Sequence, residues 1–231
     1  MSLVFFSFHL SFFIFHLSNY HLIHRLIAQG EHQQQDFKYE ISDARKIART
    51  LSAFANTDGG RLLIGVKDNG KIAGVRSDEE VYMVEAAASL YCVPPVQCHM
   101  SVHRVEGHNV VVAEVDAVEE RPVRAQLEDG KLCAFVRIAD ENIVAPPVQM
   151  ALWREASNEK GVLLPFTSRE QALLQMLAKA ELPMTLNRFA RLGHLPRHRA
   201  VQLLAQFVRF GLVSQQFVDH TFVYVAVGNE L

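Results

Sequence analysis

The apolar positions between Ala44 and Ala55 recur at the spacing of one helix face, and they form the most regular pattern in the chain. Ser42 is a suitable N-cap for this helix, and Asp43 lies where the helix dipole favours a negative charge. Residues 56–60 (Asn-Thr-Asp-Gly-Gly) end the helix, because their glycines allow a positive φ. The basic residues that fall mostly off the apolar stripe are Arg45, Lys46 and Arg49. The pattern therefore predicts an amphipathic helix with a basic outer face.

Shorter patterns on both sides of this helix complete a domain of mixed helices and strands. Apolar positions within 22–27 have helical spacing, and Gly30 is a suitable residue to end that helix. Neighbouring strands are joined by hairpin turns, so the order of elements favours an α+β fold with a mixed sheet over a doubly wound sheet. Strands are predicted at 35–39, 61–66, 72–75, 96–105, 108–115 and 133–138, and helices over 78–90 and from Pro146-Pro147 to 156.

A second, smaller domain follows a boundary at residues 158–161 (Asn-Glu-Lys-Gly). Three helices are predicted over 168–179, 186–192 and 196–210, followed by a β-hairpin of residues 212–217 and 221–227. Three helices followed by a hairpin are typical of a winged helix. The predicted organisation is an extension over 1–21, the mixed-sheet domain over 22–157 and the winged helix over 166–228.

The extension over residues 1–21 is strongly apolar but lacks the features of a membrane span. Its central part, Leu3–Leu17, is shorter than the roughly 20 residues that cross a bilayer, and serines and histidines interrupt it. It also has neither the basic start nor the small-residue cleavage site of a signal peptide. We expect a non-native or mis-started extension, or an element docked on a neighbour. Membrane anchoring is the alternative, and no membrane partner is assigned.

The composition is that of an ordinary packed protein, with 49% apolar and 21% charged residues among 231. The formal net charge of −2 is unevenly distributed. From Gly161 onward, seven Lys and Arg residues stand against four acids, which gives the second domain a basic excess. The three cysteines lie in apolar or strand-like runs without metal-ligand spacing, so we expect reduced thiols and a cytoplasmic protein. No metal is assigned to the scattered histidines.

Two consecutive segments carry a family resemblance: residues 51–60 (LSAFANTDGG) and 62–70 (LLIGVKDNG). Together with Gly30-Glu31 and residues 36–38 (Asp-Phe-Lys), they resemble the Schlafen AlbA domain, which is also labelled a divergent AAA domain in bacterial chains. The resemblance covers about residues 22–155 and implies an α+β nucleic-acid-binding fold. The chain lacks the phosphate-binding motif G-x-x-x-x-G-K-[ST], so we interpret Gly59-Gly60 as a turn.

The resemblance also implies a candidate catalytic site, because some members of the Schlafen branch cut RNA with three carboxylates. The matching positions are Glu31, Asp36 and Asp68. Carboxylates of this kind hold Mg²⁺ or Mn²⁺, which stabilises charge on the transferring phosphoryl group. Asp36 departs from the pattern, since the relatives more often carry Glu there. The alternative is that Glu31 caps or pairs with Lys38 and that Asp68 only makes a turn.

Basic residues in both domains are candidates for phosphate contacts, which would make binding salt-dependent. In the first domain they are Lys38, Arg45, Lys46 and Arg49; in the second they are Arg197, His198 and Arg199, at the start of the third helix. A solvated helix face is the alternative for the first set. The sequence thus favours a protein that binds DNA or RNA, as a transcriptional regulator or accessory factor. The alternatives are a metal-dependent endoribonuclease and an assembly protein whose winged helix forms a homo-oligomer.

Overall fold

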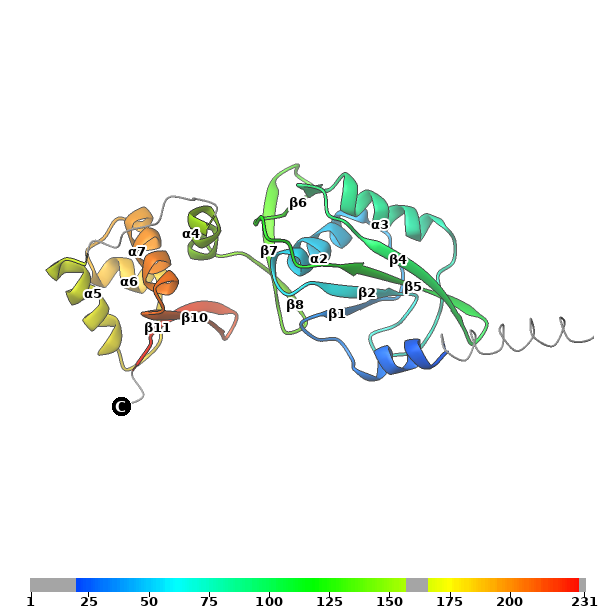
Figure 1. The fold of residues 1–231 in the computed structure, drawn as a ribbon, viewed down its shortest axis with the longest axis horizontal. Coiled ribbons are helices and arrows are strands. Elements are labelled where there is room, and N and C mark those ends of the chain that lie inside the picture. The colour runs from blue at the N-terminus through cyan, green and yellow to red at the C-terminus, as the bar shows by residue number, and fades with distance from the viewer. Residues whose placement is uncertain (1–19, 157–165, 229–231) are drawn as a thin grey trace, which may run out of the picture. The chain divides into compact units, whose positions relative to one another are not determined.

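The computed structural model describes residues 20–156 and 166–228, and the chain divides into two compact units, Met1–Val144 and Ala145–Leu231 (Figure 1). The apolar stretch Leu3–Leu17 and the predicted boundary at 158–161 lie outside the described residues. Within the described ranges, no helix has the length and apolar character needed to cross a membrane.

The first unit contains a four-stranded mixed sheet, as the sequence predicts. Its strands are β1 (Gln35–Lys38), β2 (Gly60–Ile64), β5 (His108–Val115) and β4 (His99–Val105), in the spatial order β1-β2-β5-β4. β1 and β2 are parallel, whereas β2 pairs with β5 and β5 with β4 in antiparallel fashion. The parallel pair is possible because helix α2 (Ala44–Asn56) connects β1 to β2.

A second, antiparallel sheet lies on the other side of α2. Its order is β3-β6-β7-β8, from β3 (Cys92–Val93), β6 (Arg124–Gln126), β7 (Leu132–Ile138) and β8 (Glu141–Val144). The apolar stripe of α2 packs against both sheets and against α3 (Glu79–Ser89), so that every residue from Thr50 to Asn56 is buried. Figure 1 shows α2 enclosed in this way. The helix is therefore the centre of the unit, and little of its surface remains exposed at its C-terminal end.

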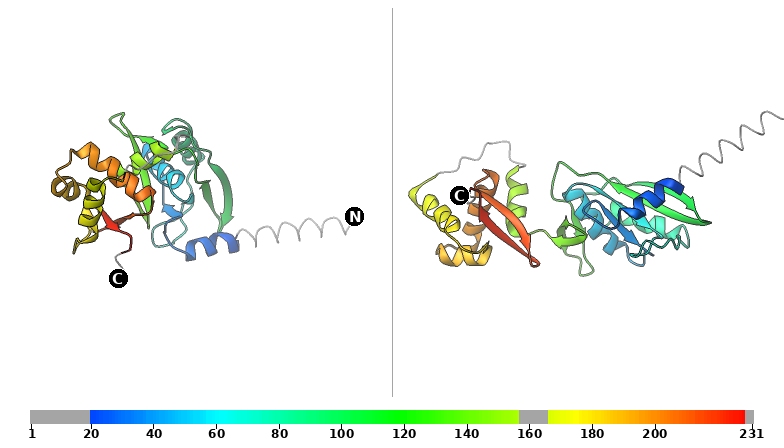
Figure 2. Two further views of the ribbon diagram at one scale, coloured as in Figure 1. Left: turned by 60° about the vertical axis from the view of Figure 1, so that its left-hand side comes forward. Right: turned by 90° about the horizontal axis from the view of Figure 1, so that it is seen from below.

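A separate apolar cluster covers the opposite face of the first sheet. Residues 20–28 are helical, and Ile23 and Leu26 are buried against Phe37 and Leu63 of the sheet. Figure 2 shows this helix alongside the strands. Gly30 has a φ of +70°, so it ends the helix in the left-handed conformation that the sequence predicts for it.

Buried polar side chains join α2 to the second sheet. Asn56 Nδ2 donates to the carbonyl oxygens of Val123 (2.8 Å) and Phe135 (2.9 Å), while Asn56 Oδ1 accepts from Val123 N (2.8 Å). Ser52 Oγ donates to the same Val123 carbonyl and accepts from Phe135 N. Because these groups are removed from water, the bonds fix the position of the second sheet on the helix.

The start of α2 differs by one residue from the prediction. Asp43, and not Ser42, is the N-cap: its backbone is extended and its carboxylate accepts from Arg45 N at 2.8 Å. Ser42 is exposed and precedes the cap. Both residue types can cap a helix, so the sequence pattern fixes the boundary only to within one position.

In its described residues, 145–156 and 166–228, the second unit contains four helices and a three-stranded sheet. The elements are α4 (Pro147–Ala156), α5 (Ser168–Ala178), β9 (Met184–Thr185), α6 (Leu186–Leu192), α7 (Arg197–Arg209), β10 (Val213–Val218) and β11 (Thr221–Ala226). The sheet order is β10-β11-β9, and both pairings are antiparallel. Val148 and Ala151 of α4 belong to this unit's core, beside Leu203 and Leu204 of α7. The helix that was predicted at the end of the first domain thus packs with the second unit.

Replacing Asn56 with Ala should destabilise the first unit by about 3 kcal/mol, because it leaves several buried backbone groups without partners. The measurement is urea unfolding of wild type and variant. Asn69→Ala is the matched control, since Asn69 makes its hydrogen bond to Lys71 N at an exposed turn; its loss should cost less than about 1 kcal/mol. Equal costs for the two variants would contradict the structural role given to Asn56.

Candidate nucleic-acid interface

Two of the three predicted carboxylates lie together at strand β1. Asp36 is on the strand and 4% exposed, and Glu31 is half-buried just before it. Glu31 Oε1 accepts from Phe37 N at 2.9 Å. Burial raises the pKa of Glu31, the Phe37 N–H lowers it, and the hydrogen bond and charge of Asp36 raise it further. The net result is a pKa above the ordinary value of 4.5. Glu31 therefore keeps its proton to a higher pH than a free glutamate does.

Cationic side chains neutralise Asp36 on both sides. Lys38 Nζ lies 2.8 Å from one carboxylate oxygen, and Arg137 Nη2 lies 3.4 Å from the other. Arg137 is 1% exposed, donates also to Gln35 O and to Asn142 Oδ1, and lies over the Phe54 ring. A buried ion pair of this kind is stable only when most of its other hydrogen bonds are made. These contacts supply them for the two Nη atoms of Arg137, whereas its buried Nε has no hydrogen-bond partner in the described structure.

Arg137 is a buried charged residue that sequence reasoning missed. It lies in β7, whose sequence LCAFVRI is otherwise apolar. A single arginine in an apolar strand is the signal that could have found it, because an arginine there needs a buried partner. Nothing in the sequence pattern, however, indicates that the partner is Asp36, about a hundred residues earlier.

Asp68 is on an exposed turn after β2, where Gly70 N donates to Lys67 O. Across residues 20–156 and 166–228, no three His, Cys, Asp or Glu side chains converge in a way that could hold a metal ion, so Asp68 does not join Glu31 and Asp36 in a common site. As they lie, the carboxylates do not fit the Mg²⁺ or Mn²⁺ site expected of a nuclease, because Asp36 is already paired with two cations. The described structure thus does not bring the three carboxylates together, and their catalytic role stays a prediction.

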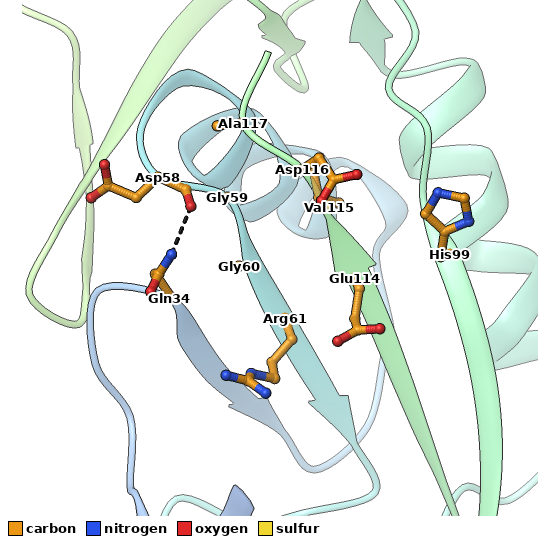
Figure 3. Close-up of a pocket in the computed structure, with 10 residues that line it drawn as sticks. All are labelled: Gln34, Asp58, Gly59, Gly60, Arg61, His99, Glu114, Val115, Asp116 and Ala117. Atoms are coloured by element: carbon orange, nitrogen blue, oxygen red, sulfur yellow. Dashed lines mark hydrogen bonds between the residues drawn. The ribbon is translucent and has the colours of Figure 1, made fainter.

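A cleft of about 360 Å³ opens beside the Gly59-Gly60 turn (Figure 3). A Cβ on Gly59, which has a φ of +71°, would come within 2.8 Å of Val115 O, and one on Gly60 within 2.5 Å of the Phe54 ring. Close packing therefore accounts for both glycines. The charged side chains that line the cleft are Asp58, Glu114 and Asp116, with Arg61 and His99. Three carboxylates in one cleft disfavour a phosphate ligand.

The candidate phosphate-binding residues of the first unit are largely engaged within it. Lys38 of β1 is paired with Asp36, and the Arg45 guanidinium lies over the Tyr91 ring, 4.8 Å from its centroid. Arg49 is half-buried, and Lys46 is exposed. Of the three basic residues that the sequence places on the outer face of α2, only Lys46 is therefore fully presented to solvent.

The basic residues of the second unit are presented to solvent. Arg197, His198 and Arg199 form the first turn of α7, and all three are exposed. Arg197 Nη1 donates to the side chain of Asn187 on α6. The first turn of α7 contains no acidic residue. The pKa of Glu170 on α5 is lowered, mainly by its hydrogen bond with the Thr167 side chain. The positive charge of Arg199 lowers this pKa further, so Glu170 lies near Arg199. This end of α7 therefore carries a local positive charge, to which the helix dipole adds.

The mixed sheet and its central helix define the first unit as an α+β domain. The model of the protein family described as "Schlafen, AlbA_2" matches residues 31–146, just over half of the chain. The chain belongs to this family, which confirms the resemblance found in its sequence. No curated protein matches it.

Two solved structures are similar. The DIP2311 protein from Corynebacterium diphtheriae is 17% identical, with a TM-score of 0.44 over 83% of this chain and 34% of that one. The chain thus spans about a third of that protein's length. The N-terminal domain of a RecG-related protein from Nitrosomonas europaea, a protein named after an ATP-dependent DNA helicase, is 20% identical. Its TM-score is 0.39, over 64% of this chain and 96% of that domain.

Glu31→Gln should change how stability depends on pH. Because the pKa of Glu31 is raised in the folded state, its contribution is greatest at low pH and is lost as the pH rises through that pKa. Gln cannot ionise, yet its Oε1 can still accept from Phe37 N. The urea midpoint of the variant should therefore rise relative to that of wild type as the pH is raised above about 4.5, the ordinary pKa of the group. A difference that does not change with pH would contradict the raised pKa of Glu31.

Proposed function

We propose that this protein binds DNA or RNA, and that the exposed start of α7 makes the principal contact. The observation that carries the proposal is the cluster of Arg197, His198 and Arg199, which is exposed, has no acid in its own helical turn and is located at a helix N-terminus. Lys and Arg side chains on such a surface gain binding energy by displacing counterions from phosphates. The chain as a whole has a net charge of −2, whereas its part from Gly161 onward has more Lys and Arg than acidic residues. This uneven distribution also favours binding through the second unit.

We propose that the second unit is a winged helix, which would suit this role. Its element order, α5-β9-α6-α7-β10-β11, and its three-stranded antiparallel sheet support that proposal. α6 and α7 are joined by a short turn in which His194 has a φ of 50°. In helix-turn-helix proteins, the second of these helices enters the major groove by its N-terminal residues. α7 occupies that place in the order.

The β10–β11 hairpin would be the wing. Its turn is formed by Asp219 and His220, both with positive φ, and Asp219 would repel a phosphate. The hairpin itself contributes no Lys or Arg between Val213 and Ala226. We therefore assign most of the electrostatic binding to α7 and little of it to the wing.

The case for nucleic-acid binding by the first unit rests more on its membership of the Schlafen AlbA family than on the predicted basic face of α2. The Schlafen AlbA domain is expected to bind nucleic acid, and Lys46 on α2 is the exposed cation among its four candidate residues. Lys38, Arg45 and Arg49 have competing partners or partial burial within the unit. A role as a transcriptional regulator or accessory factor in the cytoplasm follows from such binding, and a comparison of DNA with RNA duplexes decides between the two ligands.

Arg199→Ala should weaken binding to labelled duplexes of DNA and RNA and lower the salt dependence. The slope of log K against log salt should fall by about one for each phosphate that the variant no longer neutralises. The measurement is fluorescence anisotropy between about 50 and 200 mM salt. Lys179→Ala is the matched control: it removes an exposed cation of the same unit, at the end of α5 instead of the start of α7, and should leave the slope unchanged.

A double Arg197→Ala and Arg199→Ala variant should lower the slope by about two. If this variant binds like wild type while Lys46→Ala lowers the slope, the interface lies in the first unit and the proposal is wrong. If no duplex binds even at low salt, nucleic-acid binding itself is wrong.

A further inference from the structure

The outer strand β4 offers a pairing edge at the side of the first sheet. Within the described part of the chain, only β5 pairs with it. β4 is seven residues long, the longest of the outer strands there. Outer strands in natural proteins are usually protected by lysine, proline or a bulge, or are kept very short. β4 contains no lysine, proline or bulge, and Arg104 near its end is its one Lys or Arg residue. Val102 at its centre is 57% exposed.

The hydrogen bonds of β5 show which backbone groups of β4 face outward. Val75 N donates to Asn109 O at 2.8 Å, so the backbone groups of Asn109 point away from β4. Asn109 is opposite Arg104, and antiparallel pairs alternate between bonded and non-bonded. The N–H and C=O groups at the open edge are therefore those of Met100, Val102 and Arg104.

The turn between the strands agrees with this assignment. Glu106 and Gly107 both have positive φ and form a two-residue hairpin loop, which places a bonded pair at Val105 and His108. The next pair, Arg104 and Asn109, is then non-bonded. The open edge thus has three outward residues at equal spacing, symmetric about Val102.

From this symmetry we propose that β4 pairs in antiparallel fashion with β4 of a second copy of the chain, with the two-fold axis at Val102. Val102 would face its own counterpart, and Met100 would face Arg104 of the second copy. Each bonded pair exchanges two hydrogen bonds, so the three pairs give about six bonds between the chains. The contact is self-complementary, as a two-fold dimer requires, and it does not depend on nucleic-acid binding.

Charge supports a second copy as the occupant. Met100 and Cys98 pack against the core on the side of α3. Burial, followed by the charges of Glu114 and Glu85, raises the pKa of the Cys98 thiol to about 11, which places Glu85 of α3 near the start of β4. Arg104 of the second copy, opposite Met100, would be within reach of Glu85. No two like charges would face each other across the axis.

The direct test is the mass of the full chain by sedimentation equilibrium. Wild type should reach twice the 26.1 kDa of one chain. Val102→Lys places two lysines opposite each other at the axis and should raise the dissociation constant at least about tenfold. Leu132→Lys is the matched control, because Leu132 is also an apolar strand residue, 48% exposed, but lies on the interior strand β7. It should leave the dimer intact.

A second variant keeps the test independent of side-chain effects. Val102→Pro removes an outward N–H and no bond to β5, since proline is tolerated where the N–H faces solvent. It should fold, as checked by circular dichroism, and should sediment as a monomer. Glu85 is tested by charge exchange: Arg104→Glu should weaken the dimer about tenfold, and Glu85→Arg added to it should restore most of the affinity.

Hydrogen exchange supplies the register. In wild type at high concentration, the amides of Met100 and Arg104 should be protected, and in Val102→Lys they should exchange quickly, while Ser101 stays protected in both. A chain that stays monomeric up to about 100 µM overturns the proposal. A dimer that survives both Val102 variants also overturns it, because the contact between the chains then lies elsewhere, for example in the second unit.

Discussion

The architecture of the first unit depends on the buried hydrogen bonds between α2 and the second sheet. Asn56 and Ser52 satisfy backbone groups of Val123 and Phe135 that would otherwise be buried without partners. The same end of α2 leads into the Gly59-Gly60 turn, whose glycines allow β2 to start against Val115 and the Phe54 ring. One short segment, residues 52–60, therefore anchors the second sheet, starts the first sheet and shapes the cleft lined by Asp58 and Asp116.

This structural role explains why the segment carries the family resemblance without carrying evident chemistry. Polar residues in a buried helix end are restricted to those that complete specific hydrogen bonds, and the following glycines are restricted by close packing. The cleft beside them is lined by three carboxylates. A cluster of exposed cations, by contrast, lies in the other unit, at the start of α7.

Much of the fold could be predicted from the sequence, because the apolar periodicity of α2 and α7 and the hairpin turns are local signals. Ser42 was the wrong cap by one residue, since Asp43 satisfies the same pattern. The partnership of Asp36 with Arg137 could not be predicted, because it joins strands of different sheets across a long stretch of chain. The contact of Arg45 with the Tyr91 ring and the partial burial of Arg49 likewise could not be predicted from helix periodicity, so the outer face of α2 is less basic than the sequence pattern indicates.

Contact between nucleic acid and the start of α7 can be tested residue by residue, by nuclear magnetic resonance of the isotope-labelled chain titrated with a short duplex. The largest shift changes should fall on the amides of Arg197, His198 and Arg199, and the cleft around Glu114 should be unaffected. Changes confined to the first unit, with none on α7, would contradict this contact.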